Sequence, residues 1–252
     1  MRSQPGTIRR GFGSTHWAIQ LVCLGGLVAT FSCAPGNPPE GAREAGTSEP
    51  QWESLFDGSS TAAWRAYQRD SFPEQGWVID GDALKTVPGG DIVDIVTRKE
   101  YRDFELILEW RVSAGGNSGI FFHATEDFPQ VWQTGPEFQV LDDDRHPDGK
   151  DPLTSAGSLY GLIAPEGKAL RPVGEFNQAR VIVRGNAVEH WLNGVRVVEF
   201  ELGSSHLRDL IGKSKFKNWP RFAQQPGGHV ALQHHGQEVW YRNIRIREFS
   251  TP

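Results

Sequence analysis

Short runs in which apolar and polar residues alternate constrain the fold of this chain more than any other feature. In residues 104–110 (FELILEW) every even position is apolar, and two of the three odd positions are glutamate. Period two is typical of a strand with one buried face. Two-residue turns containing Asn and Gly join three more such runs, 180–183, 187–192 and 195–201. Asn-Gly is a strong hairpin signal, because a type I′ turn needs positive φ at both central residues.

Further segments extend the same pattern along the chain. The sequence predicts strands at 76–84 and 91–98, and again at 229–235 and 239–249. Residues 205–213 are the best candidate for a helix, and no helical periodicity runs for more than about two turns. Many short strands separated by regular turn signals indicate a sandwich or a barrel. We therefore expect an all-β domain.

The first 33 residues have the features of an export signal. Arg2, Arg9 and Arg10 give a positive start, and an apolar stretch follows from Trp17 to Phe31. This stretch is shorter than the roughly 20 residues that a membrane-spanning helix needs. It ends at Cys33 in a sequence that resembles a bacterial lipoprotein signal, in which the cysteine becomes the acylated first residue. An ordinary secretory signal cut nearby is the alternative. The prediction is export to the periplasm or cell surface, with lipidation at Cys33 and a lipid anchor in a membrane.

The remaining chain divides into a flexible tether at 34–50 and one domain at 51–252. The tether is rich in Pro, Gly, Ala and Glu and has no large apolar residue to bury. Both cysteines, Cys23 and Cys33, lie in the signal segment, which excludes cysteine nucleophiles and cysteine-ligated zinc from the domain. Without the three signal arginines the formal net charge changes from −5 to −8. An acidic domain argues against nucleic acid as a partner and fits a neutral ligand such as a sugar.

The segment 136–147 is the strongest candidate for a functional site. Glu137 and Gln139 should share the open face of a strand, while the apolar residues between and after them face the core. A carboxylate and an amide side by side suit sugar hydroxyls. Asp142 and His146 follow at the strand end, where a loop could bring them over the same face. A solvated aspartate turn is the alternative reading of this acidic run.

Two other segments carry polar groups that alternation does not explain. In 115–123 (GGNSGIFFH) small residues open a strand where another group approaches the backbone closely, and His123 is expected on the same face as Phe121. A hydrogen-bonded surface histidine is the alternative for His123. In 232–236 (LQHHG), Gln233 and His235 share a face.

The alternation pattern allows two orientations for Arg242 and predicts one position for His190. Arg242 has the parity of Ile244, so it should point inward unless a bulge turns it towards the site, and a plain surface arginine is equally consistent. His190 is expected at the surface of a hairpin, with Trp191 as a candidate stacking residue.

Several common catalytic signatures are absent from the sequence. It contains no Gly-x-Ser-x-Gly elbow, no His-Glu-x-x-His and no phosphate-binding glycine loop. The chain is therefore not a typical serine hydrolase, zinc protease or nucleotide enzyme.

Seven sequence blocks between Trp52 and Phe249 carry a family resemblance. They are 55–58 (LFDG), 117–121 (NSGIF), 137–142 (EFQVLD), 159–165 (LYGLIAP), 190–194 (HWLNG), 233–236 (QHHG) and 239–244 (VWYRNI). Together they resemble the 3-keto-disaccharide hydrolase family, which implies a concanavalin A-like jelly-roll sandwich of two antiparallel sheets. Where this chain has His234, the family usually has Asp.

The same fold hosts laminarinase-type glucanases, whose catalytic strand reads Glu-x-Asp-x-x-Glu. The equivalent positions here are Glu137, Gln139 and Asp142. A retaining glycosidase needs two carboxyl groups about 5–5.5 Å apart, and the middle carboxylate is replaced by an amide. Ordinary retaining hydrolysis is therefore not expected.

The resemblance implies cleavage of a glycoside already oxidised to a ketone at C3, by elimination and hydration or by hydrolysis. Elimination needs a base, a stabiliser for the enolate oxygen and an acid for the leaving group. The resulting hypothesis makes Glu137 or His146 the base, with His235 and Arg242 polarising the 3-keto oxygen. The substrate-binding residues would be Gln139, Asp142, Tyr160, Gln233, Trp240 and His123. No cofactor is required, and a divalent metal is compatible with the chemistry although no ligand spacing demands one.

Two hypotheses from other classes stay open at this point. A non-catalytic carbohydrate-binding module would use the same face without turnover, and would not need the titratable cluster of Glu137, His146 and His235. A structural or adhesion domain at the cell surface would have no small-molecule pocket. The sequence leaves the oligomeric state open.

Overall fold

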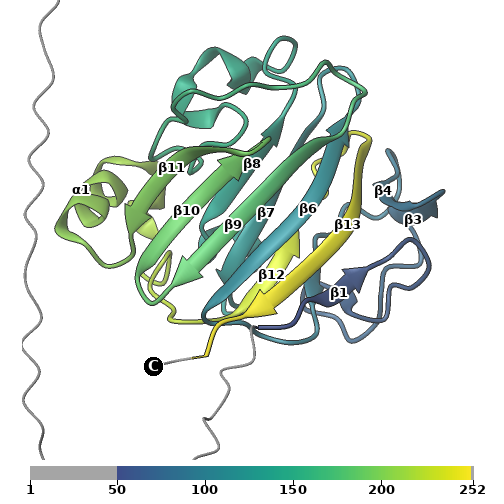
Figure 1. Cartoon of the computed structure of the whole chain (residues 1–252), viewed down its shortest axis with the longest axis horizontal. Helices are drawn as coiled ribbons and strands as arrows, with labels where there is room; N and C mark the ends of the chain where they lie inside the picture. Colours follow the sequence, from purple (N-terminus) through teal and green to yellow (C-terminus); the bar gives the residue numbers. More distant parts are fainter. Residues whose placement is uncertain (1–49, 251–252) are drawn as a thin grey trace, which may run out of the picture. The chain divides into compact units, whose positions relative to one another are not determined.

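Two antiparallel sheets packed face to face form the domain in the computed structural model, which describes residues 50–250 (Figure 1). The predicted signal segment, Cys33 and nearly all of the predicted tether lie outside these residues. The predicted all-β fold, a concanavalin A-like jelly-roll sandwich of two antiparallel sheets, is confirmed. No helix among residues 50–250 is long and apolar enough to cross a membrane.

The larger sheet has eight strands: β1 (Glu53–Phe56), β3 (Trp77–Asp80), β4 (Ala83–Thr86), β6 (Phe104–Val112), β9 (Asn177–Arg184), β10 (Ala187–Leu192), β11 (Val195–Glu201) and β13 (Val239–Glu248). Their order is β11-β10-β9-β6-β13-β4-β3, and β1 pairs with β13 as well. The predicted Asn193-Gly194 turn joins β10 to β11, with positive φ at both residues. Strands from both ends of the chain therefore meet in one sheet.

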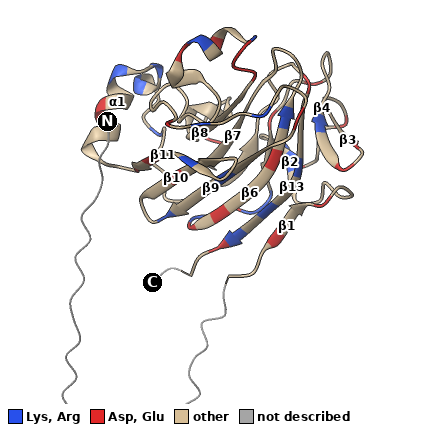
Figure 2. Cartoon of the chain, turned by 45° about the horizontal axis from the view of Figure 1, so that its top comes forward, with Lys and Arg blue, Asp and Glu red and all other residues tan. Residues whose placement is uncertain are grey.

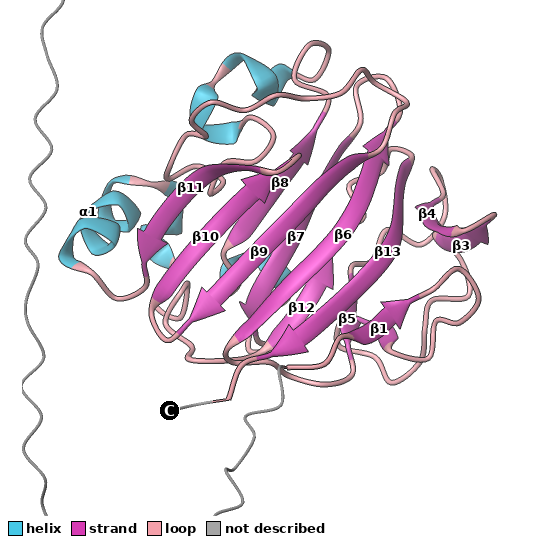
Figure 3. Cartoon of the chain, in the orientation of Figure 1, coloured by secondary structure: helices cyan, strands magenta, loops and turns pink. Residues whose placement is uncertain are grey.

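The smaller sheet has five strands: β2 (Trp64–Ala66), β5 (Ile95–Thr97), β7 (Asn117–Ala124), β8 (Glu137–Leu141) and β12 (His229–Leu232). Their order is β2-β5-β12-β7-β8. The predicted helix is α1 (Ser205–Lys213), and four 3₁₀ turns complete the described elements: η1 (Val131–Gln133), η2 (Pro147–Lys150), η3 (Pro152–Thr154) and η4 (Lys215–Asn218). α1 lies at the margin of the strands, beside β11, and other helical turns lie above or behind the strands in this view (Figure 3).

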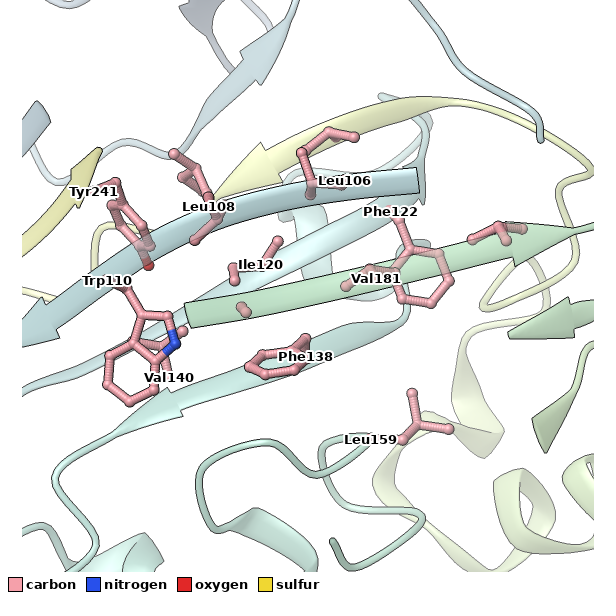
Figure 4. Packing of buried hydrophobic residues seen from close by; sticks show 14 of the residues in the cluster. Leu106, Leu108, Trp110, Ile120, Phe122, Phe138, Val140, Leu159, Val181 and Tyr241 are labelled. Atoms are coloured by element: carbon pink, nitrogen blue, oxygen red, sulfur yellow. The ribbon is translucent and has the colours of Figure 1, made fainter. Parts of the chain in front are cut away.

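The hydrophobic core lies between the two sheets. Leu106, Leu108 and Trp110, the even positions of β6, are all buried there and face side chains of the smaller sheet such as Phe138 (Figure 4). The predicted alternation in β6 is therefore confirmed. One polar contact crosses this core, because the Ser118 hydroxyl lies 2.6 Å from the Tyr241 hydroxyl.

The outer face of the larger sheet carries rows of opposite charges along β6 and β13 (Figure 2). Arg242 belongs to this face, where its Nε donates to Glu109 Oε2 at 2.7 Å and its Nη1 lies 3.0 Å from Asp82 Oδ2. The prediction that Arg242 points inward is wrong. A bulge at Asn243, whose φ is +52°, shifts the register between Arg242 and Arg245 and reverses the inward parity that Ile244 suggested.

A second bulge changes the position of His123. The register of β7 with β12 shifts near its end, and His123 has a φ of +50°. Its ring packs against Phe104 of the opposite sheet, and its Nε2 lies 2.8 Å from the Arg102 carbonyl oxygen. The prediction that His123 shares a face with Phe121 is therefore wrong, since His123 turns into the space between the sheets.

His190 also lies in the core rather than at a hairpin surface. It is fully buried, its ring packs against Phe138 and Phe122, and its Nδ1 lies 3.3 Å from the Gly157 carbonyl oxygen. Burial lowers the pKa of His190 to about 4, so the imidazole is neutral at pH 7. The expectation of a surface histidine was wrong because the β10 alternation places His190 on the inner face with Val188 and Leu192.

Candidate active site

A pocket of about 670 Å³ lies on the outer face of the smaller sheet. Glu137 and Gln139 of β8 enter it, while Phe138 and Val140 between and after them join the core. This is the alternation that the sequence predicted for β8. The other polar lining residues include Asp94, Asn117, Tyr160, Lys215, Gln233 and His235.

The pairing of the strands places a row of polar residues side by side on the floor of the pocket. Gly119 of β7 pairs with Gln139 on one side, and on the other side its carbonyl oxygen accepts from the Gln233 backbone N–H at 3.0 Å. Asp94 stands next along the row, since it precedes Ile95, which pairs with Leu232. Asp94, Gln233, Gly119 and Gln139 thus cross four neighbouring strands. Gly119, between Gln233 and Gln139, has no side chain and leaves a gap in this row.

The next row of the sheet is apolar except for Glu137. Phe121 pairs with Glu137 on one side and with Ala231 on the other, and Ala231 pairs with Val96. Phe121, Ala231 and Val96 are all buried in one cluster. The backbone of Glu137 therefore lies in a row of apolar residues, and a carboxylate close to them loses hydration.

The side chain of Glu137 extends over Gly119. A Cβ placed on Gly119 would lie 2.1 Å from Glu137 Oε1, so only glycine leaves room for the carboxylate. The sequence prediction that small residues in this strand admit a close approach is confirmed, and the approaching group is Glu137 itself. Glu137 is only 6% exposed, and no described residue gives its carboxylate a hydrogen bond or an ion pair. Burial raises the pKa of Glu137 well above its usual range. The Lys215 charge opposes this effect, and the Asp94 charge adds to it.

Asp94 is a second acidic group in the pocket that sequence reasoning missed. Its Oδ1 accepts from the His234 backbone N–H at 2.9 Å. Burial nevertheless raises the pKa of Asp94 to about 7, although the residue keeps some exposure towards the pocket. The signal in the sequence was an aspartate within the apolar run 92–96 (IVDIV), which alternation does not explain.

Gln139 offers an unpartnered acceptor at the end of the polar row. It is fully buried, and its Nε2 donates to the Thr154 carbonyl oxygen at 3.2 Å. Its Oε1 has no hydrogen-bond partner among the described residues. An unsatisfied buried acceptor costs free energy, so Gln139 Oε1 is a candidate acceptor for a ligand in the pocket.

Two histidines meet at the rim of the pocket. The rings of His146 and His235 lie 6.2 Å apart, nearly edge to face. His235 lines the pocket and is exposed, and its Nδ1 lies 3.2 Å from Gln237 Oε1. His146 is not part of the lining, and it approaches the pocket through Asn117, whose Nδ2 lies 3.3 Å from its Nε2. The structure thus brings both predicted histidines together, with His235 nearer to the pocket.

One wall of the pocket is aromatic and carries a cation. Trp132 and Tyr160 form the wall, and Lys215 Nζ lies 4.3 Å from the Tyr160 ring centroid. Tyr160 also donates its hydroxyl to Asp148 Oδ2 at 3.2 Å. Tyr160 was predicted here. Trp132 and Lys215 were not, because they lie in the short 3₁₀ turns η1 and η4, which have no periodic pattern in the sequence.

Three predicted site residues lie elsewhere. Arg242 and Trp240 are on the outer face of the larger sheet, where Trp240 Nε1 donates to Asp80 Oδ2 at 2.8 Å. His123 lies between the sheets. None of these three lines the pocket.

Asp142 is also outside the pocket, and its carboxylate accepts hydrogen bonds from the backbone of two loops. Its Oδ2 accepts from the Gly115 backbone N–H at 2.7 Å, and its Oδ1 accepts from Asp144 and Arg145 backbone N–H groups at 3.1 and 3.3 Å. Both oxygens are therefore occupied, and Asp142 supplies no second carboxylate beside Glu137.

His234 also lines the pocket, and it is held in place on both sides. Its Nδ1 accepts from the Gly236 backbone N–H at 3.1 Å, and its ring packs edge-on against Trp77. Among residues 50–250, no three His, Cys, Asp or Glu side chains are grouped so that they could hold a metal ion. No ligand set for a metal can therefore be assigned in this pocket.

Comparison with known proteins places the chain among carbohydrate-active proteins. A protein from Bacteroides thetaiotaomicron named 3-keto-disaccharide hydrolase is 34% identical over 223 residues, which is 77% of each chain. A crystal structure described as a candidate glycosyl hydrolase from Parabacteroides distasonis is 28% identical with a TM-score of 0.73, and covers 79% of this chain and 94% of its own.

A second such structure from Parabacteroides distasonis is 27% identical with a TM-score of 0.62, and covers 79% of this chain and all of its own. The family described as the 3-keto-α-glucoside-1,2-lyase-like domain matches residues 51–247, which include every strand from β1 to β12 and most of β13. The chain therefore belongs to the 3-keto-α-glucoside-1,2-lyase-like family.

Proposed function

We propose that this protein is an enzyme that cleaves the glycosidic bond of 3-keto-glycosides, including 3-keto-disaccharides, by elimination between C1 and C2. The family and the relative named 3-keto-disaccharide hydrolase support the substrate class. The observation that carries the proposal is the Glu137 carboxylate, which is buried over Gly119 without a partner in the described part of the chain. A desolvated carboxylate is an effective base for a proton beside a ketone.

The first step follows from the position of Glu137. The ketone at C3 makes the C2 proton acidic, and Glu137 removes it. The electron pair then forms the C1–C2 double bond as the aglycone leaves C1, and water adds to C1 of the enone to give the free 3-keto sugar. Glu137 fits this role better than His146, the other candidate base, because Glu137 lines the pocket and His146 does not.

Other pocket residues bind and polarise the substrate in this proposal. His235 is the remaining candidate to polarise the 3-keto oxygen, since Arg242 lies on the other sheet. The amides of Gln139 and Gln233 hold sugar hydroxyls, and Tyr160 supplies a ring-stacking surface. Elimination also explains why the second carboxylate of a retaining glycosidase is unnecessary.

A pure carbohydrate-binding module would not need this arrangement. An unpartnered buried carboxylate destabilises the fold, and a lectin surface can bind hydroxyls with neutral amides alone. This loss of fold stability is consistent with a catalytic base, because ionisable groups with shifted pKa values concentrate at functional sites.

The first prediction concerns the C2 proton. A 3-keto-glucoside turned over in deuterated water should give a product that carries deuterium at C2, as observed by NMR. Glu137→Gln keeps the side-chain size and removes the base, so it should lower the rate by about 10²–10⁴-fold and stop the exchange at C2. Saturable binding of the substrate by the wild-type protein without turnover would instead identify a binding module. Cleavage without deuterium at C2 would identify hydrolysis.

The second prediction concerns Gly119. Gly119→Ala places a methyl group where Glu137 Oε1 now lies, so the carboxylate must move away from the polar row. We expect kcat/KM to fall by about 100-fold, as for other small displacements of catalytic groups. The melting temperature should also fall, because Glu137 Cδ and Cγ would lie 2.7 and 2.9 Å from the new Cβ and the whole side chain must move. Gly212→Ala in α1 is the matched control, since a Cβ there meets no atom within 4 Å. Equal activity of the two variants would contradict the placement of Glu137.

The third prediction concerns pH. Glu137 must be ionised to act as a base, and its pKa is raised, so kcat/KM should increase with pH through a value above the usual glutamate range of about 4.3. Asp94→Asn removes a charge that raises the pKa of Glu137, and should therefore shift this acidic limb to lower pH. A pH profile of kcat/KM for both proteins tests this. An unchanged limb, or a shift to higher pH, would rule out the coupling.

We further propose that the protein is exported and attached to a membrane through an acyl group on Cys33. The support is the sequence alone, namely the arginine-flanked apolar stretch that ends at this cysteine. Mass spectrometry of the mature protein from its native host should find an acylated amino terminus at Cys33. An unmodified amino terminus at another position would contradict the anchor.

A further inference from the structure

Lys215 is the cation of the pocket that the proposed mechanism does not yet use. It is the first residue of η4, and its position is fixed on both sides. The Ser214 hydroxyl accepts from the Phe216 backbone N–H at 3.1 Å, and the Phe216 ring stacks on Phe222 with centroids 4.0 Å apart. Lys215 therefore extends towards the pocket from an anchored turn.

The surroundings of its ammonium group are unusual for a lysine. Of the two cations that line the pocket, Arg69 is paired with Asp91, whereas Lys215 has no carboxylate within 4.0 Å among the described residues. Its Nζ instead lies 4.3 Å from the Tyr160 ring centroid and 5.2 Å from that of Trp132. An aromatic surface attracts a cation without taking up its N–H donors, so these donors stay available to a ligand.

The charged groups that face Lys215 come from two directions. Glu137 of β8 and Asp148 of η2 both favour the charged form of the lysine, while loss of hydration disfavours it. Loss of hydration is the larger effect, and it lowers the pKa of Lys215 even though the side chain is exposed at the pocket mouth. A lysine with a lowered pKa gives up its proton more readily near neutral pH.

We propose that Lys215 is the acid that protonates the leaving aglycone, an inference that rests on the elimination proposed above. Glu137 and Lys215 form a base and an acid that share one pocket and interact electrostatically. Tyr160 is less suited to this task, because its hydroxyl is engaged with Asp148 and burial raises its pKa. The aglycone then lies along Trp132 and Tyr160, beneath the ammonium group.

The proposed step balances protons and electrons. Glu137 takes the C2 proton, and the C2–H electron pair forms the C2–C3 double bond of an enolate whose charge lies on the 3-keto oxygen. The enolate then re-forms the ketone as its electron pair makes the C1–C2 double bond, and the C1–O pair goes to the aglycone oxygen. The Lys215 ammonium gives that oxygen a proton and becomes a neutral amine. In the hydration step the amine takes a proton from water as the hydroxyl bonds to C1. The proton held by Glu137 exchanges with solvent before hydration, and Glu137 then gives a solvent-derived proton to C2. Both groups then have their starting charges, and the net reaction is hydrolysis.

Leaving groups of different basicity distinguish this role from a structural one. A methyl 3-keto-glucoside needs a proton on its leaving oxygen, whereas a 4-nitrophenyl 3-keto-glucoside does not, because nitrophenolate leaves as an anion. Lys215→Gln should slow the methyl glycoside by about 10²–10⁴-fold and the nitrophenyl glycoside by less than about tenfold. Exchange of the C2 proton of the methyl glycoside with deuterated water should continue when each protein is assayed on its high-pH plateau, because loss of the Lys215 charge raises the pKa of Glu137 further but leaves its carboxylate in place.

Two further variants sharpen the test. Lys215→Arg keeps a positive charge but does not release its proton, so it should show the same selective loss as Lys215→Gln. Lys217→Gln, two residues further along η4 and exposed outside the pocket, is the matched control and should retain wild-type rates with both substrates.

Other results would overturn the assignment. Equal loss with both substrates would mean that Lys215 only supports the pocket, and full rescue by Lys215→Arg would mean that it acts by charge alone. A selective loss in Asp94→Asn and not in the Lys215 variants would identify Asp94 as the acid. Failure of the wild-type protein to cleave or exchange any 3-keto-glucoside would overturn the proposed function, and this inference with it.

Discussion

The site depends on one steric relation, the Glu137 carboxylate lying over Gly119. Strand pairing places Glu137 in a row with Phe121 and Ala231, and the missing side chain at Gly119 lets the carboxylate reach the neighbouring polar row. Burial without a partner is unfavourable for a carboxylate, and the rigid sheet beneath it holds it there. The Glu137 carboxylate is thus kept desolvated and more basic than usual at the position where the proposed reaction needs a base.

The two sheets have different tasks. The larger sheet neutralises its outer charges in ion pairs, such as Glu105 with Arg180 and Arg247, and none of these groups is available to a ligand in the pocket. The outer face of the smaller sheet instead leaves Glu137, Gln139 Oε1 and Lys215 without partners in the described chain. This contrast is the reason that we propose the active site on the outer face of the smaller sheet.

Much of the fold and part of the site could be predicted from local sequence. Period-two alternation gave the faces of β6 and β8, and the Asn-Gly turn between β10 and β11 was recognisable from two residues. Such patterns are local, so they survive without knowledge of the partner strands. Alternation failed at the bulges near His123 and Asn243, because one extra residue reverses the faces and leaves no mark in the sequence.

The sequence by itself determined the all-β class, the open face that carries Glu137 and Gln139, and a close approach of some group to the small residues that open the strand at 117–121. Only the tertiary structure decided which strands lie side by side, and therefore that Asp94 joins the polar row. It also brought Lys215 to an aromatic wall more than 50 positions away from Tyr160 in the chain, and took Arg242 to the opposite sheet. The physical reason is that alternation fixes which face a side chain takes, whereas long-range pairing and loop packing fix its neighbours.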